Sequence, residues 1–202
     1  YSADDAAELA ARAGNQLLVT TAKDAVKLRT LLPERAMFVV EQTLEFESGA
    51  GELMSMTVRT GVWIPALAKY GSHELKEQSL APALRGDMVG CVAVTEPGAG
   101  SDVAGIITRA ELDGDEYVIN GAKMFITNGT QADWVCLLAR TAPGRGYKGM
   151  SLIMVPTNTP GFSVSKKLSK MGNLSSDTAV LSFENARVPQ SNIVGGEGMG
   201  FY

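Results

Sequence analysis

The stretch Val94-Thr95-Glu96-Pro97-Gly98-Ala99-Gly100-Ser101-Asp102 follows an apolar run and decides what fold is expected around it. The run, Met88 to Val94, has the length of a buried strand. Pro97 lacks an N–H donor, while Gly98 and Gly100 can take positive φ and let backbone N–H groups turn toward one point. The loop is therefore either a cradle for a phosphate or an ordinary tight turn between strands.

Two hydroxyl groups and a second stretch extend this candidate site. Thr95 and Ser101 stand at the edges of the loop, where each can donate to a phosphate or to a heterocycle carbonyl. Gly121-Ala122-Lys123-Met124-Phe125-Ile126-Thr127-Asn128-Gly129 is predicted as an alternating strand that ends in an Asn-Gly turn. Phe125 and Thr127 then share a face that can contact a flat ring system, although a core aromatic and a surface threonine are the ordinary alternative.

Together the two stretches resemble the middle domain of the acyl-CoA dehydrogenases, in which TEPGAGSD and an aromatic-Ile-Thr-Asn-Gly strand hold the flavin. The resemblance runs from about Met54 to the last residue. It includes further motifs in the family's order: Trp63–Leu67, Lys69–Ser72, Asp113–Gly121, Pro160–Phe162, Lys170–Gly172, Ser176–Thr178, Phe183–Glu184, Val188–Pro189 and Gly198–Phe201. It implies an FAD-dependent oxidoreductase that converts an acyl-CoA to a trans-2-enoyl-CoA.

The resemblance also implies which residues contact FAD: Val92, Val94, Thr95, Gly100, Ser101, Phe125, Ile126 and Thr127. Thr95 is expected at the pyrimidine end of the isoalloxazine, Phe125 against the ring, and Thr127 at N5. Ser101 is expected where the cofactor meets the CoA arm of the substrate. Lys148 is expected near CoA, with an exposed, solvated cation as the alternative.

No catalytic base is assigned. In the family a carboxylate of the C-terminal helical domain removes the α-proton, and this chain is expected to be a fragment that ends at Tyr202, before that domain. Glu96 and Asp102 lie in the loop, but a base must come within about 3 Å of its proton, and nothing in the sequence places either of them there. For the full-length protein, the resemblance implies a homo-oligomer with an electron-transfer flavoprotein as the acceptor of its electrons.

Residues 1–53 carry a different resemblance. A strand over 16–20, a helix over 23–32 and a strand over 36–40 predict a βαβ fragment. The stretch Thr20 to Leu28 and its flanks resemble the C-terminal end of the tetraacyldisaccharide 4'-kinases of lipid A synthesis. The P-loop pattern of that family does not occur in the sequence, so no nucleotide site is carried over. The two resemblances meet near Ser48–Gly51, which predicts a fusion.

The composition limits the class of protein. The chain has 202 residues, 45% of them hydrophobic and 20% charged, with a formal net charge of −4, which favours a globular fold and argues against nucleic-acid binding. No apolar stretch is long enough to span a bilayer, and the N-terminus lacks a signal-peptide pattern, which favours the cytoplasm. With His73 as its only histidine, the chain predicts no metal site.

The expected fold class is α+β. Residues 1–52 form the βαβ-type fragment, residues 53–87 a helical pair, and residues 88–202 an antiparallel β-barrel or sandwich. Asp113–Asp115 and Asn120–Gly121 are predicted hairpin turns. Two other functions stay open: a non-catalytic β-domain module, and a remnant of the lipid A kinase.

Overall fold

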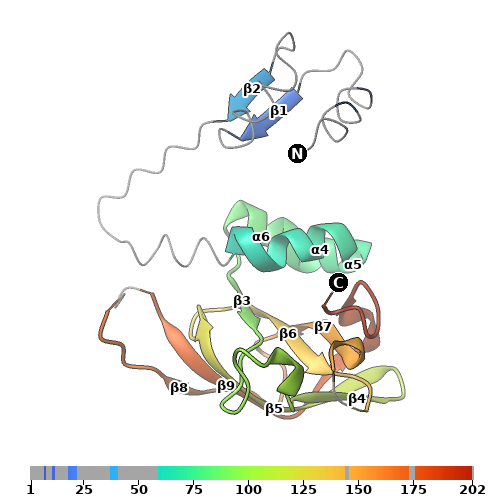
Figure 1. Ribbon diagram of the computed structural model, residues 1–202, viewed down its shortest axis with the longest axis vertical. Coiled ribbons are helices and arrows are strands. Elements are labelled where there is room, and N and C mark those ends of the chain that lie inside the picture. Colours follow the sequence, from blue (N-terminus) through green and yellow to red (C-terminus); the bar gives the residue numbers. More distant parts are fainter. Residues whose placement is uncertain are drawn as a thin grey trace. The chain divides into compact units, whose positions relative to one another are not determined.

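The chain divides into two compact units, Tyr1–Glu47 and Ser48–Tyr202 (Figure 1). The computed structural model describes positions 7, 11, 18–21, 37–40, 59–143, 146–172 and 176–201. In the first unit β1 (Leu18–Thr21) and β2 (Met37–Val40) pair in parallel. The helix expected between them lies outside the described residues, so the βαβ fragment and its kinase resemblance remain predictions.

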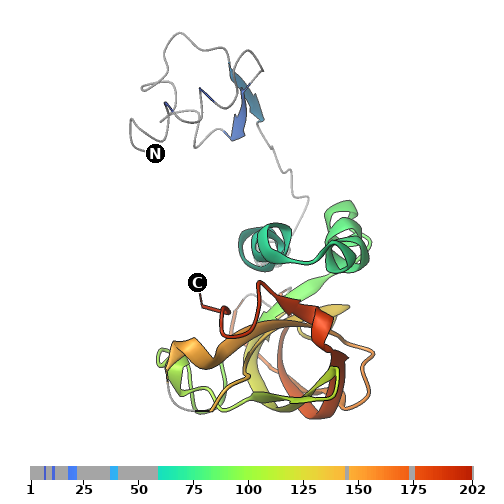
Figure 2. The ribbon, with the colours of Figure 1, turned by 90° about the vertical axis from the view of Figure 1, so that its right-hand side faces the viewer.

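The second unit contains an eight-stranded sheet that curls into a rounded body (Figure 2). Its strands are β3 (Gly90–Ala93), β4 (Arg109–Asp113), β5 (Glu116–Thr127), β6 (Trp134–Arg140), β7 (Met150–Pro156), β8 (Phe162–Lys167), β9 (Thr178–Pro189) and β10 (Ile193–Val194). The order is β10-β7-β6-β4-β5-β9-β8, and β3 also pairs with β6.

The sheet is mixed, which corrects the prediction of an antiparallel one. β3 runs parallel to β6, and β4 meets β6 in a parallel pair at Arg109 and Arg140. The remaining pairs are antiparallel. The parallel pairs arise because the chain leaves β3, forms the β4–β5 hairpin, and only then enters β6 beside both β3 and β4.

One of the two predicted hairpin turns is confirmed. Asp113 pairs with Glu116, and Gly114 between them has φ 67°. The turn predicted at Asn120–Gly121 is wrong, because β5 runs through these residues without reversing. Gly121 has φ 147° and lies opposite a bulge in β9. The Asn120 side chain does not start a turn but accepts a hydrogen bond from the Asn185 N–H in that bulge.

A helical layer covers one side of the sheet (Figure 1). It consists of the π-helical turn η1 (Arg59–Trp63), α4 (Ile64–Tyr70), α5 (His73–Leu75), the π-helical turn η2 (Lys76–Leu80) and α6 (Ala81–Arg85). Ser72 caps α5, since its hydroxyl accepts from the Leu75 N–H at 3.2 Å. The helix continues through Pro82 to Arg85, because the wider π-helical turn before Pro82 accommodates a residue that lacks an N–H.

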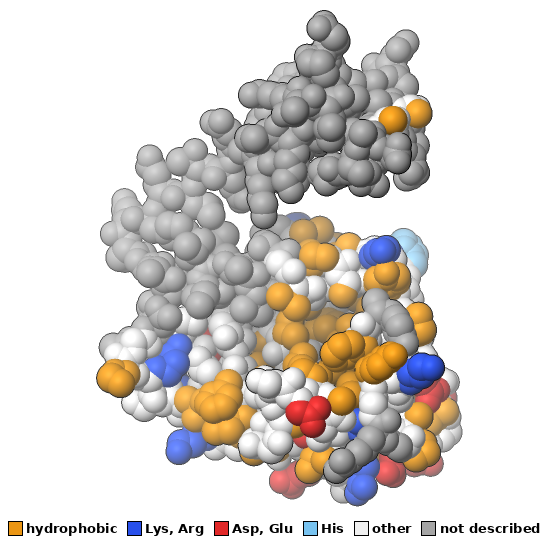
Figure 3. Space-filling model, in the orientation of Figure 1, with side chains coloured by type: hydrophobic (Ala, Val, Ile, Leu, Met, Phe, Trp, Pro, Cys, Tyr) orange, Lys and Arg blue, Asp and Glu red, His pale blue; other side chains and the backbone are white. Residues whose placement is uncertain are grey.

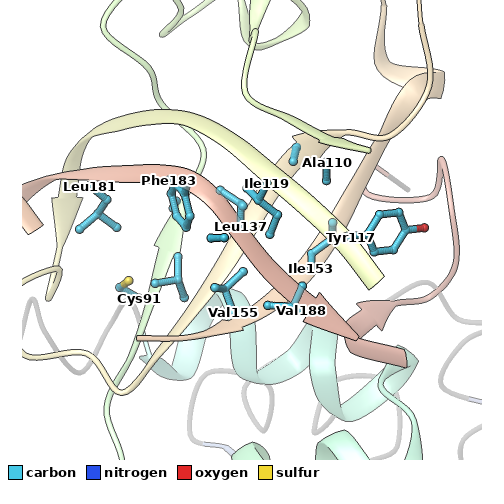
Figure 4. Close-up of a cluster of buried hydrophobic side chains, with 14 of the residues drawn as sticks. Cys91, Ala110, Tyr117, Ile119, Leu137, Ile153, Val155, Leu181, Phe183 and Val188 are labelled. Carbon is cyan, nitrogen blue, oxygen red and sulfur yellow. The ribbon is translucent and has the colours of Figure 1, made fainter. Parts of the chain in front are cut away.

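Two apolar clusters hold the unit together. One fills the interior of the curled sheet and includes Cys91, Leu137 and Phe183 (Figure 4). The other packs the helices on the sheet, where Trp63 is 1% exposed. The helical residues of this second cluster are therefore covered by the sheet. Cys91 and Cys136 are free, buried thiols, and burial raises the pKa of Cys136 to about 12.

The outer surface is mixed in character. Apolar side chains gather near the middle of the described face in Figure 3, and charged side chains lie both beside them and toward the margin. Exposed large apolar residues of the second unit include Phe125, Tyr147, Met199 and Phe201. No helix within the described residues is long and apolar enough to cross a membrane.

Candidate functional site

The two stretches singled out in the sequence lie against each other. The Met124 N–H donates to the Thr95 carbonyl at 2.8 Å. One residue earlier, the Lys123 ammonium donates to the Val94 carbonyl at 2.9 Å. The end of β3 and the end of β5 are therefore joined residue by residue, which brings the expected flavin contacts Val94 and Thr95 beside those of β5.

The loop after Thr95 closes on itself. Glu96 and Ala99 exchange backbone hydrogen bonds of 2.8 and 3.2 Å, so both of these N–H donors are used within the loop. Neither Gly98 nor Gly100 has a positive φ, although other glycines of the unit do. The expectation that positive-φ glycines turn the N–H groups of this loop toward one anion is therefore wrong, because a turn closed by mutual hydrogen bonds needs no left-handed residue.

A buried ion pair lies beneath this loop. The Lys123 ammonium and the Glu96 Oε1 are 2.9 Å apart, and their side chains are 0% and 2% exposed. The Glu96 carboxylate also accepts from the Ile107 N–H at 2.7 Å and from the Thr108 N–H at 2.9 Å. Both oxygens are thus occupied, and Glu96 is not available as a general base.

Burial and ion pairing shift the pKa values of Glu96 and Lys123 in opposite directions. Burial by itself raises the pKa of Glu96, but the hydrogen bonds from Ile107, Thr108 and Lys123 outweigh it and hold that pKa below the ordinary 4.5. Burial lowers the pKa of Lys123 to about 8, against the raising effect of Glu96. At neutral pH the pair is ionised.

Acid is expected to weaken the domain through Glu96. Since its pKa is lower in the folded than in the unfolded chain, its contribution to stability is present above pH 4.5 and is lost as the pH falls through the folded value. The urea midpoint of the wild type should therefore fall between pH 5 and pH 3 more steeply than that of Glu96→Gln. Parallel pH profiles of the two proteins, followed by tryptophan fluorescence, would contradict this assignment.

Phe125 has an unusual backbone. Met124 and Phe125 lie opposite the single residue Val180, so β5 contains a β-bulge at this point. Phe125 has φ 63°, and its side chain is 60% exposed, while the next residue, Ile126, is 2% exposed. A bulky residue in the left-handed region with a solvent-exposed ring is costly for the folded chain, and such strain clusters at functional sites.

Asp177 fixes the turn that follows the C-terminal end of β5. Its carboxylate accepts from the Thr130 N–H at 2.7 Å, from the Thr130 hydroxyl at 2.8 Å and from the Gln131 amide at 2.9 Å. Its carbonyl accepts from the Asn128 N–H at 3.3 Å. The predicted Asn-Gly turn is present, with Asn128 at φ 66°, and Asp177 holds it directly after the half-buried Thr127.

The other residues predicted to contact FAD or CoA differ in their surroundings. Ser101 is exposed in the loop, and Gly100 would carry a Cβ only 4.0 Å from the Thr95 methyl group. Val92 packs its side chain toward the helices. Lys148 is exposed in the short 3-10 helix Tyr147–Gly149, on a separate segment of the chain.

Two cavities lie in this part of the domain. One of about 420 Å³ is lined by Glu96, Pro97, Gly98 and residues of β4 and β5, and another of about 540 Å³ by residues 104–107 and 140–143 among others. Neither is lined by Phe125 or Thr127. These two cavities are therefore not formed by the β5 residues expected to contact the flavin.

Sequence reasoning missed the roles of Lys123, Glu96 and Asp177. One signal was available for Lys123: it continues the inward alternation of Tyr117 and Ile119, and a lysine at an inward position requires a carboxylate partner. The β-bulge that follows Lys123 could not be predicted from the alternation, because a bulge changes which of the later residues face inward.

The fold and the joined segments define a curled β-domain with a mixed sheet. Residues 91–186 match the family model described as acyl-CoA dehydrogenase, middle domain. This match and those of similar proteins support the acyl-CoA dehydrogenase family, a family of oxidoreductases, for this part of the chain.

Particular relatives agree with this family. The chain is 41% identical over 146 residues to the mitochondrial short-chain specific acyl-CoA dehydrogenase of Rattus norvegicus, a match of 72% of this chain and 35% of the relative. It is 49% identical over 138 residues to the acryloyl-CoA reductase (NADH) of Anaerotignum propionicum, covering 67% and 35%. A solved structure described as the FAD complex of PigA matches with TM-score 0.72 and 32% identity, covering 74% and 39%. The chain thus spans about a third of the length of these curated relatives.

Proposed function

We propose that residues 88–202 form the flavin-binding middle domain of an FAD-dependent acyl-CoA dehydrogenase, which converts an acyl-CoA to a trans-2-enoyl-CoA. The observation that carries the proposal is the hydrogen bond from the Met124 N–H to the Thr95 carbonyl. It joins the two segments that carry the family's flavin motifs, and it does so where β5 bulges and turns Phe125 outward.

The residues present fit a flavin. Thr95 and Thr127 offer hydroxyl groups, and Phe125 offers an exposed ring on a fixed, strained backbone. These side chains would hold and orient the isoalloxazine, and Ser101 would lie toward the CoA arm. FAD, when bound, supplies the hydride chemistry. The chain's own part is to bind and orient it.

The substrate and the partners belong to the same proposal. An acyl-CoA is the proposed substrate, with Lys148 near its CoA moiety, and an electron-transfer flavoprotein is the proposed acceptor of the electrons. The 49% identity to an acryloyl-CoA reductase favours a second candidate: the same site working in the direction of enoyl-CoA reduction. Both candidates require flavin binding by the β-domain.

A non-catalytic module is the competing function. Within the described residues the Glu96 carboxylate is fully engaged by its hydrogen bonds and Asp102 lies exposed in the loop, so neither is assigned as a base. Flavin binding separates the two readings, because a scaffold domain has no need of it.

FAD titration of the purified chain, followed by flavin fluorescence, tests the proposal. We expect saturable binding, weakened by about 3- to 10-fold in Thr95→Ala and in Ser101→Ala, as the loss of one hydrogen bond implies. Ser163→Ala, an exposed hydroxyl on β8, serves as the matched control and should bind as the wild type does. A folded chain that does not bind FAD would leave the non-catalytic module as the better account.

Phe125→Gly should separate stability from binding. Glycine removes the left-handed strain but adds backbone entropy to the unfolded chain, so the free energy of unfolding should change by less than about 1 kcal/mol. FAD binding should weaken by at least tenfold, on the order of 1.4 kcal/mol, because the ring is lost. Urea unfolding and FAD titration measure the two effects, and a large loss of stability with unchanged binding would show that Phe125 is a packing residue.

A further inference from the structure

We infer that the Lys123–Glu96 ion pair is a positioning device that holds the loop 94–102 and the bulged end of β5 in the relative arrangement that FAD requires. The inference rests on the flavin site proposed above and goes beyond it. It assigns a role to two residues that lie beneath the binding face and do not belong to it.

The lysine side of the pair connects β5 with the loop. The Lys123 ammonium donates to the Val94 carbonyl and to the Glu96 carboxylate, both at 2.9 Å, so it holds the residues on either side of Thr95. The next residue, Met124, donates its N–H to Thr95 itself. Three consecutive residues of the loop are thereby fixed to two consecutive residues of β5.

The glutamate side connects a third segment. Glu96 accepts from the N–H groups of Ile107 and Thr108, just before β4 begins. Thr108 in turn lies against Gly121 of β5, where an added Cβ would meet the Thr108 Cα at 2.8 Å. One carboxylate therefore gathers the loop, the entry to β4 and the middle of β5.

The location of the pair explains why it acts only by positioning. Both side chains are essentially without solvent exposure, and neither is among the proposed flavin contacts. A buried ion pair is often no more stabilising than an apolar replacement of similar volume, so stability alone is a weak reason for it. Its charged hydrogen bonds do fix geometry, since they depend on direction as well as distance.

The β-bulge in β5 is the reason why the position of this segment matters for FAD binding. Phe125 lies two residues after Lys123 in a left-handed conformation that the surrounding structure must enforce. Without the clamp, the segment can relax to the regular alternation of a strand, which changes the direction of Phe125 relative to Thr95. The ring and the hydroxyl then no longer present one face to FAD.

A double-mutant cycle on FAD affinity tests the inference. Glu96→Gln, Lys123→Met and the double variant are titrated with FAD under conditions where tryptophan fluorescence shows each to be folded. We expect each single change to raise the Kd for FAD by roughly tenfold or more, and the double change to raise it no further, because residues that act as one unit are non-additive. The visible circular dichroism of bound flavin should change as well.

Val155→Ala is the matched control for lost stability. Val155 is a fully buried residue of β7 outside the proposed site, so its truncation should destabilise the domain while leaving the Kd for FAD within twofold of the wild type. If Lys123→Met does not fold, Glu96→Gln carries the test, since it keeps the shape of the side chain. Wild-type affinity in folded Glu96→Gln overturns the inference and leaves the flavin site standing. No FAD binding by the wild type overturns both.

Discussion

Lys123→Met is expected to lower the free energy of unfolding by about 3 kcal/mol. The substitution leaves the Glu96 carboxylate buried without its cation, and an uncompensated buried charge is strongly destabilising. The loss should stay near the lower end of the range for broken buried pairs, because the N–H groups of Ile107 and Thr108 still bind the carboxylate. Urea unfolding followed by tryptophan fluorescence measures it, since both tryptophans lie buried in this unit.

The same substitution at an exposed lysine provides the control. Lys166 lies exposed on β8, and Lys166→Met should change the free energy of unfolding by less than about 0.5 kcal/mol. Equal effects of Lys123→Met and Lys166→Met would show that the buried pair is not formed in solution.

Gly121→Ala is expected to be at least as damaging, with a loss of about 3 kcal/mol or more. Gly121 has φ 147°, and a Cβ there would lie 2.4 Å from the Thr108 hydroxyl and 2.8 Å from the Thr108 Cα. Relief requires the backbone of Thr108 to move, and Thr108 is one of the residues that bind Glu96. The change should therefore lower the urea midpoint and also disturb the loop.

Gly114→Ala separates crowding from backbone strain. Gly114 also has a positive φ, 67°, but an added Cβ there meets nothing within 4 Å. Its substitution should cost only the left-handed strain, about 1–2 kcal/mol. If Gly114→Ala destabilised the domain as much as Gly121→Ala, close contact with Thr108 would not be the cause.

The strands of the second unit were largely predictable from the sequence. The strand over 134–140 follows from the sequence, because six apolar or small residues, 134–139, stand between turn signals. The β4–β5 hairpin follows from Asp-Gly chemistry in the same way. The sequence predicts a hairpin turn at Asn120–Gly121 within what is the single strand β5, since Asn-Gly has the same local signature whether it turns the chain or lies opposite a bulge.

The parallel pairing of β3 with β6 was not predictable from local patterns. It depends on where the chain returns after the β4–β5 hairpin, and this is decided by packing between residues far apart in the sequence. The π-helical turn before Pro82 is a similar case, because the helix adjusts its own geometry to keep Leu75 and Leu80 in the apolar cluster.

At the site, the sequence indicated the segments but not their arrangement. The motifs brought Thr95, Phe125 and Thr127 together as flavin contacts, and the structure places their segments side by side. The bulge at Met124 and Phe125 was beyond the sequence, because strict alternation puts Phe125 on the same inward face as Lys123. The fold instead turns the lysine inward and the ring outward.

Mapping FAD onto the chain by amide chemical shifts tests the central claim most directly. A ¹⁵N-labelled sample of this 21.3 kDa chain is titrated with FAD, and each amide signal is followed. The account predicts saturable shifts that concentrate at Thr95, Ser101 and residues 125–127, with little change on β8. Shifts confined to other parts of the domain, or none at saturating FAD, would contradict a flavin site built on the joined ends of β3 and β5.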